Sequence, residues 1–224
     1  MDNSGYIISI SKEQLAELPV TAYPGAISVI DSPSAAHTAI RVLSREAMVG
    51  FDTETRPSFR KGCRHKVALM QISTADRCFL FRLNKIGICA ELKKFLENPA
   101  VLKIGLSLHD DFDAIRRTED FDPQGFVDLQ KLVKNFEITD ISLQKIYAII
   151  FGERISKGQR LTNWEADVLT DAQQAYAALD AWACLKIYRY LEAGQFNVVS
   201  SPYRHLPVPA TSKCSQEQEK SSEQ

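Results

Sequence analysis

Hydrophobic residues in the first half of the chain are grouped in short runs that are typical of β-strands. We predict strands over residues 26–30, 48–54, 67–73 and 78–83. Only Thr74 to Arg77 separates the last two runs. These two strands should therefore form a hairpin that continues an antiparallel sheet.

Two helices are predicted before and between these strands. Residues Ser11 to Gln14 resemble a capping box that opens a short helix, which stops before Pro19. Residues 34–46 show helical periodicity and lead the chain into the strand that ends at Glu54. The apolar face predicted for this second helix consists of Ala35, Ala39, Val42 and Leu43.

Beyond residue 90, helices and strands are predicted to alternate. The pattern indicates helices over 91–97 and 110–117, a strand over 101–106, and a short strand or strand-to-helix corner over 125–129. Residues 129–191 are mainly helical, with a polar interruption at 153–163. Hairpin strands followed by alternating strands and helices predict an α/β fold, in which helices flank a mixed sheet.

Length and composition indicate one principal domain. The chain has 224 residues, of which 45% are hydrophobic, enough for one substantial core. We divide it into an N-terminal extension with a short helix (1–24), the main domain (25–193) and a polar tail (194–224), disordered from about residue 207. No apolar stretch has the length of a signal peptide core or a membrane span, so we expect a cytoplasmic protein without membrane contact.

Charge and cysteine content exclude several classes of protein. The formal net charge is -1 and the pI is about 6.4, so phosphate binding would depend on local basic patches rather than on a global positive field. The five cysteines form no C-x-x-C pair, which fits neither a disulfide framework nor a zinc site. Reduced thiols are expected.

An acidic pair ends the second predicted strand. Asp52 and Glu54 are two residues apart, so both side chains point to the same face of a strand. Carboxylates held this close repel each other, and a hard divalent cation such as Mg²⁺ or Mn²⁺ resolves the repulsion. Acidic residues also collect at strand ends because loops are solvated, so the pair alone does not define a metal site.

Two other segments offer acidic partners. His109 to Asp113 contains three acids where the strand over 101–106 turns into a helix, although acids in a first helical turn often only complement the helix dipole. Tyr176 and Asp180 are four residues apart and share one face of a late helix. Such a pair is often no more than a half-buried tyrosine near a surface acid.

Taken in order, these motifs resemble the 3′-to-5′ exonucleases of the DEDD superfamily. The resemblance is to the tyrosine-bearing branch, which includes ribonuclease D and the exonuclease domain of the Werner syndrome helicase. It covers roughly residues 27–191, and the segments 66–73, 161–164 and 169–181 resemble parts of that branch. The histidine-bearing branch has a histidine five residues before the last acid, where this chain has Ala175.

The resemblance implies a ribonuclease H-like mixed sheet, with the first three strands antiparallel and the next ones parallel. It also implies release of nucleoside 5′-monophosphates from a 3′ end, with two divalent cations, Mg²⁺ or Mn²⁺, about 4 Å apart. The implied catalytic residues are Asp52, Glu54, Asp111, Tyr176 and Asp180, and the four acids among them are the implied metal ligands. Asp111 is chosen because it follows Gly105 by six positions, and the neighbouring Asp110 stays open as an alternative. Tyr176 is expected to orient the attacking water rather than to take its proton, because a phenol with a pKa near 10 is a poor base at pH 7.

The expected substrate is a nucleic acid, either a single-stranded 3′ end or a recessed duplex. Basic residues crowd the loop after Glu54, and a second basic cluster at 154–160 precedes the tyrosine helix, so phosphate contacts are expected from both. Ser107 and His109 stand where some relatives contact the 3′ terminus. Phe59 is either placed to stack on the terminal base or a residue of the core. The candidate substrate-binding residues are Thr53, Thr55, Arg56, Phe59, Arg60, Lys61, Ser107, His109 and Arg160.

Two alternatives remain on the sequence alone. One is a catalytically silent nucleic-acid-binding or scaffold module of the same fold. The other is a strand cutter of another class on a ribonuclease H-like sheet, which would need the carboxylates but not Tyr176. About thirty mostly polar residues follow Leu191, too few for a further nucleic-acid-binding domain, so we expect a free-standing catalytic domain. The sequence leaves open whether RNA or DNA is the substrate.

Overall fold

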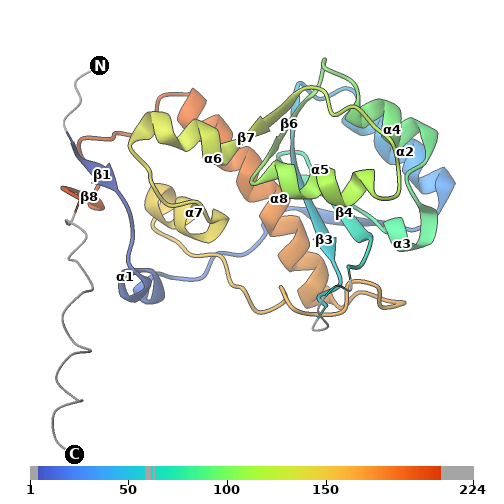
Figure 1. Ribbon diagram of the computed structural model, residues 1–224, viewed down its shortest axis with the longest axis horizontal. Coiled ribbons are helices and arrows are strands. Elements are labelled where there is room, and N and C mark those ends of the chain that lie inside the picture. The colour runs from blue at the N-terminus through green and yellow to red at the C-terminus, as the bar shows by residue number, and fades with distance from the viewer. Residues whose placement is uncertain (1–4, 59–61, 63, 208–224) are drawn as a thin grey trace, which may run out of the picture.

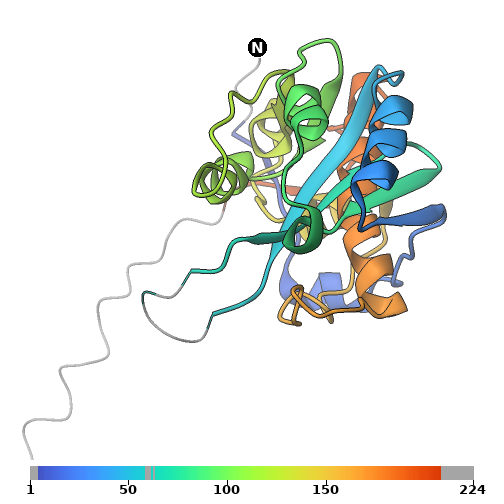
Figure 2. The ribbon, with the colours of Figure 1, turned by 90° about the vertical axis from the view of Figure 1, so that its right-hand side faces the viewer.

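The computed structural model describes residues 5–58, 62 and 64–207. Its centre is a six-stranded mixed sheet in the order β2-β5-β4-β3-β6-β7 (Figure 1). The strands are β2 (Ala26–Ile30), β3 (Met48–Thr55), β4 (Val67–Ser73), β5 (Arg77–Phe81), β6 (Leu102–Gly105) and β7 (Phe126–Asp128). The long β3 strand crosses the middle of the molecule (Figure 2).

The strand directions confirm the predicted mixed sheet. Strands β3, β4 and β5 form an antiparallel meander, and β6 and β7 then continue the sheet parallel to β3. Strand β2 pairs with β5 in parallel at the sheet edge. That pairing was not predicted, because the local pattern identified β2 as a strand without indicating its partner.

Helices cover both faces of the sheet. The helices are α1 (Lys12–Glu17), α2 (Pro33–Leu43), α3 (Leu83–Ile86), α4 (Ala90–Leu96), α5 (Leu108–Arg116), α6 (Leu129–Leu132), the 3-10 helix η1 (Val133–Phe136), α7 (Leu143–Phe151) and α8 (Asp171–Glu192). Helices α2, α4 and α5 share a core with Phe51 on one face. The long α8 covers the other face, where it packs on β3 and β4, and α7 packs against α8 (Figure 1).

Close packing of α8 on β3 depends on small residues. A Cβ atom added to Gly50 would lie 1.8 Å from the carbonyl oxygen of Ala181, so only glycine fits at this strand position. Helix α8 begins at a capping box formed by Thr170 and Gln173. The glycine brings the backbone of α8 directly over β3, two residues before Asp52.

The predicted elements differ from the observed ones mainly at their ends. The capping box at Ser11 is present, and α2 ends at Leu43 rather than at residue 46. Val42 was assigned to the apolar face of α2, but it is 41% exposed, and Ala36 and Ile40 are buried instead. The strand predicted over 78–83 is β5, which ends at Phe81 because Leu83 already begins α3.

Both ends of the described chain meet in a small second sheet. Strand β1 (Ile7–Ile8) pairs antiparallel with β8 (Arg204–His205), and Arg204 also forms an ion pair with Glu137 at 2.7 Å. This pairing was not predicted, because residues 194–207 were assigned to a polar tail. The disorder predicted further along falls on residues 208–224, outside the described residues.

Helix hydrophobicity and the state of the cysteines complete the description of the fold. Among the described residues, no helix combines the length and the hydrophobicity that crossing a membrane requires. The described cysteines Cys78, Cys89 and Cys184 are free thiols, and burial raises the pKa of Cys78 and of Cys184.

Candidate active site

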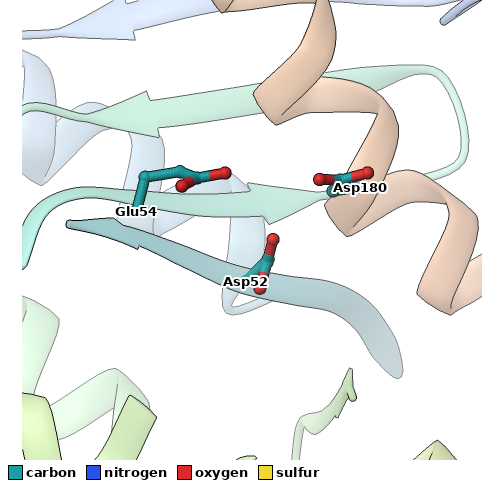
Figure 3. A group of neighbouring side chains, drawn as sticks. All are labelled: Asp52, Glu54 and Asp180. Carbon is teal, nitrogen blue, oxygen red and sulfur yellow. The ribbon is translucent and has the colours of Figure 1, made fainter. Parts of the chain in front are cut away.

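Three carboxylates converge where β3 passes under α8. Ligand oxygens of Asp52, Glu54 and Asp180 all lie within 4.8 Å of one another. Asp52 and Glu54 project from the same face of β3, and Asp180 points toward them from α8 (Figure 3). The fold thus brings together two segments, β3 and α8, that are far apart in the sequence.

Asp111 adds a fourth carboxylate beside this group, although it lies outside the 4.8 Å cluster. Strand β6 pairs with β3 only as far as Gly50, so the next part of β3 is free to meet the first turn of α5. There the hydroxyl of Thr53 donates a hydrogen bond to Asp111 Oδ1. The side chain of Asp110 is 88% exposed, so the geometry favours Asp111 over Asp110 as the acid of the site.

The turn before α5 holds Asp111 in place. Ser107 has φ 61°, a left-handed conformation that a non-glycine residue adopts only when its surroundings enforce it. The Asp128 carboxylate accepts backbone hydrogen bonds from Ser107 N at 3.2 Å and from Leu108 N at 3.3 Å. It also accepts from Gln130 N at 2.9 Å, so one side chain caps both α5 and α6.

The four carboxylates resist ionisation because each is at least partly removed from water and lies near other acids. Burial, followed by the charges of Asp111, Asp180 and Glu54, raises the pKa of Asp52 well above its usual value. Burial and the neighbouring acids Asp180 and Asp111 raise the pKa of Glu54 to about 9, against a smaller opposing effect of Arg160. Burial also raises the pKa of Asp111 and of Asp180 to about 7 each.

This arrangement fits a divalent cation. Oxygen ligands from carboxylates are what Mg²⁺, Mn²⁺ and Ca²⁺ prefer, and cysteine or histidine ligands would point to other metals. The cluster contains only carboxylates, and among the described residues Arg160 is the cation whose charge acts on Glu54. A bound dication would relieve the repulsion that raises these pKa values.

We predict that the protein without bound cations loses stability as the pH rises. A group with a raised pKa in the folded state stabilises that state below its unfolded pKa, near 4 for a carboxyl, and this contribution disappears as pH passes the folded pKa. The values of about 7 for Asp111 and Asp180 and about 9 for Glu54 place this loss between about pH 4 and pH 9. Thermal unfolding in a chelator should show the midpoint falling across that range.

Saturating Mn²⁺ should flatten this pH dependence, because the bound charge offsets the repulsion. An unfolding midpoint in chelator that stays constant or rises from pH 5 to pH 9 would contradict the electrostatic account.

Tyr176 lies one turn before Asp180 on α8 and is half-buried. Interaction with its phenol lowers the pKa of Asp180, against the larger effect of burial. Burial, followed by the charges of Asp180 and Glu54, raises the pKa of Tyr176 above its usual value. Its ring lies 6.1 Å from the ring of Trp164, centroid to centroid. Trp164 is fully buried, so its indole packs in the core beside the site.

The predicted substrate-binding residues divide into groups. Arg160 is exposed and lies close enough to Glu54 to lower its pKa, so the structure brings it to the site. Arg56 Nη1 lies 3.2 Å from Glu165 Oε2, which ties the base of the β3–β4 loop to the segment before α8. Phe59, Arg60 and Lys61 fall outside the described residues.

The other candidates have the following surroundings in the structure, and their proposed contacts with substrate stay predictions. The hydroxyl of Thr53 is committed to Asp111, so its position beside the site serves that acid. Thr55 is half-exposed at the end of β3, where the register with β4 shifts. Ser107 shapes the turn before α5, and the His109 side chain is 84% exposed and close to Asp110 and Asp113. Arg154, from the second basic cluster, donates from Nε to the carbonyl oxygen of Leu18 at 3.0 Å, which links the start of this cluster to the N-terminal segment.

Two residues that organise the site, Asp128 and Glu165, were not predicted from the sequence. An aspartate directly before the helical segment at 129 is a capping signal, but the link from Asp128 to α5 is a long-range contact. Glu165 also lies 3.3 Å from His65 Nδ1, in addition to its pair with Arg56. No local pattern indicates that second interaction.

Comparisons with known proteins agree with this geometry. A model of the 3′-5′ exonuclease family matches residues 27–194. The mouse bifunctional 3′-5′ exonuclease/ATP-dependent helicase WRN is 28% identical over 205 residues, a match that covers 85% of this chain and 15% of that protein. The chain therefore belongs to the 3′-5′ exonuclease family and, as its motifs indicate, to the DEDD superfamily of such hydrolases.

Solved structures confirm the ribonuclease H-like fold. The EXO domain of Aedes aegypti Nibbler superimposes with a TM-score of 0.70 at 21% identity, covering 80% of this chain and 96% of that one. Escherichia coli RNase D, described as an exoribonuclease involved in structured RNA processing, has a TM-score of 0.68 at 22% identity and covers 75% of this chain. This chain corresponds to 44% of that RNase D chain, so its own activity and substrate are matters for a proposal.

Proposed function

We propose that this protein is a metal-dependent 3′-to-5′ exonuclease, which hydrolyses the terminal phosphodiester bond of a nucleic acid and releases nucleoside 5′-monophosphates. The observation that carries the proposal is the convergence of Asp52, Glu54 and Asp180 within 4.8 Å, with Asp111 beside them. Family membership supplies the reaction class, and the geometry supplies the residues.

Asp52, Glu54, Asp111 and Asp180 are the residues that would hold two divalent cations, Mg²⁺ or Mn²⁺. Bound cations supply Lewis-acid stabilisation of the phosphate charge and lower the pKa of water in the site. Thr53 fixes the orientation of Asp111, and the close approach of α8 to Gly50 fixes Asp180 relative to β3. The protein's contribution is therefore a set of carboxylates that its own contacts hold in place.

The proposed reaction consumes one water per nucleotide. Its oxygen bonds to the terminal phosphorus, and the bond from that phosphorus to the O3′ of the preceding nucleotide breaks. The shortened strand regains a 3′-hydroxyl, and the released nucleotide keeps the phosphate on its 5′ oxygen. Tyr176 orients the water through its phenol, because the raised pKa of this group keeps it protonated at neutral pH.

Positive charge beside the acids favours a nucleic-acid substrate. Arg160 lies near Glu54, and Arg56 lies at the end of β3 with a side chain that is 47% exposed. A polar loop segment carries Arg160, and Gln173 Nε2 fixes this segment by donating to Thr162 Oγ1 at 3.0 Å. We propose that Arg160 and Arg56 contact backbone phosphates of the strand that enters the site.

Digestion of matched oligonucleotides tests the proposed function. Single-stranded RNA, single-stranded DNA and a recessed duplex, each labelled at the 5′ end, should be shortened stepwise from the 3′ end in Mg²⁺ or Mn²⁺. Nucleoside 5′-monophosphates should accumulate, and a chelator should abolish their release because the carboxylates alone repel a phosphate. The relative rates of digestion of the three oligonucleotides also identify the preferred substrate.

Two results would overturn the proposal. Internal fragments that appear before the 3′ end is lost would indicate an endonuclease of another class. Binding of all three oligonucleotides without release of mononucleotides in either metal would indicate a silent binding module.

A further inference from the structure

A buried glutamine without a hydrogen-bond partner lies next to the carboxylates. Gln71 on β4 is 0% exposed, and neither its amide nitrogen nor its amide oxygen has a partner among the described residues. A buried amide normally has partners, because leaving it unpaired costs about 1–3 kcal/mol. An unpaired group of this kind needs an explanation from its surroundings.

The sheet register identifies those surroundings. Gln71 lies directly opposite Asp52 on β3 and opposite Leu80 on β5. Opposed residues of antiparallel strands share a face, and their Cβ atoms are about 4.5–5.5 Å apart. Gln71 and Asp52 therefore face α8 side by side, within the layer that contains the candidate site.

The other residues directly adjacent to Gln71 on this face offer little polar contact. Leu69 and Leu80 belong to the apolar cluster that includes Ala177 and Ala181 of α8. Ser73 already donates its hydroxyl to the carbonyl oxygen of Thr74 at 2.9 Å. Of the four residues adjacent to Gln71 on its face of the sheet, Asp52 is the one with a charged side chain.

We propose that Gln71 is a positioning residue for Asp52. Its amide NH₂ donates a hydrogen bond to the Asp52 carboxylate when the site carries its cations, and this fixes the orientation in which Asp52 binds them. In the protein without cations the amide stays unpaired, so Gln71 contributes to metal affinity rather than to stability. The inference rests on the proposed function, because it assigns metal binding to Asp52.

The substitution Gln71→Met tests the proposal, because methionine has a similar length and no hydrogen-bonding amide. Removing an outer partner of a metal ligand typically weakens metal binding about 10- to 100-fold. We expect calorimetric titration of the full chain with Mn²⁺ to show a loss of affinity in that range. Thermal unfolding in a chelator should show a midpoint equal to or above that of the wild type, because no hydrogen bond is lost.

Leu80→Met is the matched control, since Leu80 flanks Gln71 on the side away from Asp52. It places methionine in the same apolar cluster and should leave Mn²⁺ affinity unchanged. This separates the loss of the amide from the effect of methionine in the core.

The other possible results would contradict either the role of Gln71 or the proposed function as a whole. Wild-type affinity in Gln71→Met, or a fall equal to that in Leu80→Met, would overturn the role of Gln71. A variant that unfolds at a lower temperature in chelator, or that fails to fold, would assign the amide a structural role instead. If the wild type itself binds no Mn²⁺ and releases no nucleotide, the proposed function fails together with this inference. If the wild type binds Mn²⁺ and releases nucleotides, only the Gln71 assignment is at stake.

Discussion

Asp52→Asn is expected to lower the rate of mononucleotide release about 1000-fold and, in the absence of cations, to make the protein more stable. The loss of rate is expected because cation binding supplies several kcal/mol of transition-state stabilisation. A loss of about 4 kcal/mol corresponds to a factor of about 1000 in rate. Asn keeps the shape of the side chain but removes the charge that attracts a cation. Asp52 is one of the three acids whose ligand oxygens lie within 4.8 Å of one another, so the substitution removes a charge from this cluster.

The expected gain in stability has the same origin, which is the loss of the Asp52 charge. Burial and three neighbouring acids raise the pKa of Asp52, which means that its charged form destabilises the folded state. A neutral Asn removes this repulsion, and the gain should be largest above the raised pKa and vanish in acid. Activity assays in Mg²⁺ and thermal unfolding in chelator, on the same preparation, measure both effects.

Asp110→Asn is the matched control for the whole carboxylate group. It removes an acid next to Asp111 on the same turn of α5, but its side chain is 88% exposed. Its activity and its unfolding midpoint should stay close to those of the wild type, whereas Asp111→Asn should behave like Asp52→Asn. An Asp52→Asn variant with wild-type activity would remove this residue from the site. A lower unfolding midpoint in chelator would contradict the repulsion.

Most elements of the fold could be predicted because their signals are local. The strands and helices around the site carry period-2 or helical patterns, and the antiparallel meander follows from the short Thr74 to Arg77 turn. Pairings between distant segments carry no such signal. Strand β2 joins β5, and β8 joins β1, through backbone contacts that any extended segment can make.

The candidate site likewise combines features that local spacing predicts with features that depend on contacts between distant segments. Spacing alone placed Asp52 with Glu54 on one strand face and Tyr176 with Asp180 on one helix face. The choice between Asp110 and Asp111 required the orientation of α5, which Asp128 and the left-handed Ser107 set from outside the helix. The pairing of Arg56 with Glu165 and the isolation of Gln71 also depend on tertiary packing.

The segments that flank the site are anchored to one another by tertiary contacts. Glu165 holds Arg56 and His65 of the β3–β4 loop, and Arg82 donates to the carbonyl oxygen of Asp167 at 3.3 Å. These contacts fix the segment before α8 against the end of the sheet. The carboxylates thus sit on rigid elements, and the proposed phosphate contacts sit on loops anchored to them.

Tyr176→Phe is expected to lower kcat about 100-fold while leaving KM nearly unchanged. Misplacement of a reacting group by about 1 Å can cost about 100-fold, and the phenol hydroxyl is the group we propose to hold the water in line. Phenylalanine keeps the ring that lies beside Trp164, so packing and stability should be preserved. Steady-state kinetics separates the effect on kcat from the effect on KM.

The pH profile distinguishes positioning from proton abstraction. Because the pKa of Tyr176 is raised, the phenol stays protonated through neutral pH, and the wild type and Tyr176→Phe should share the same profile shape at different heights. A limb of the wild-type profile that disappears in the variant would show that the phenol titrates during turnover and acts as a base. An unchanged kcat would instead leave the orientation of the water to the carboxylates and their cations, and would place this chain closer to strand cutters that need no tyrosine.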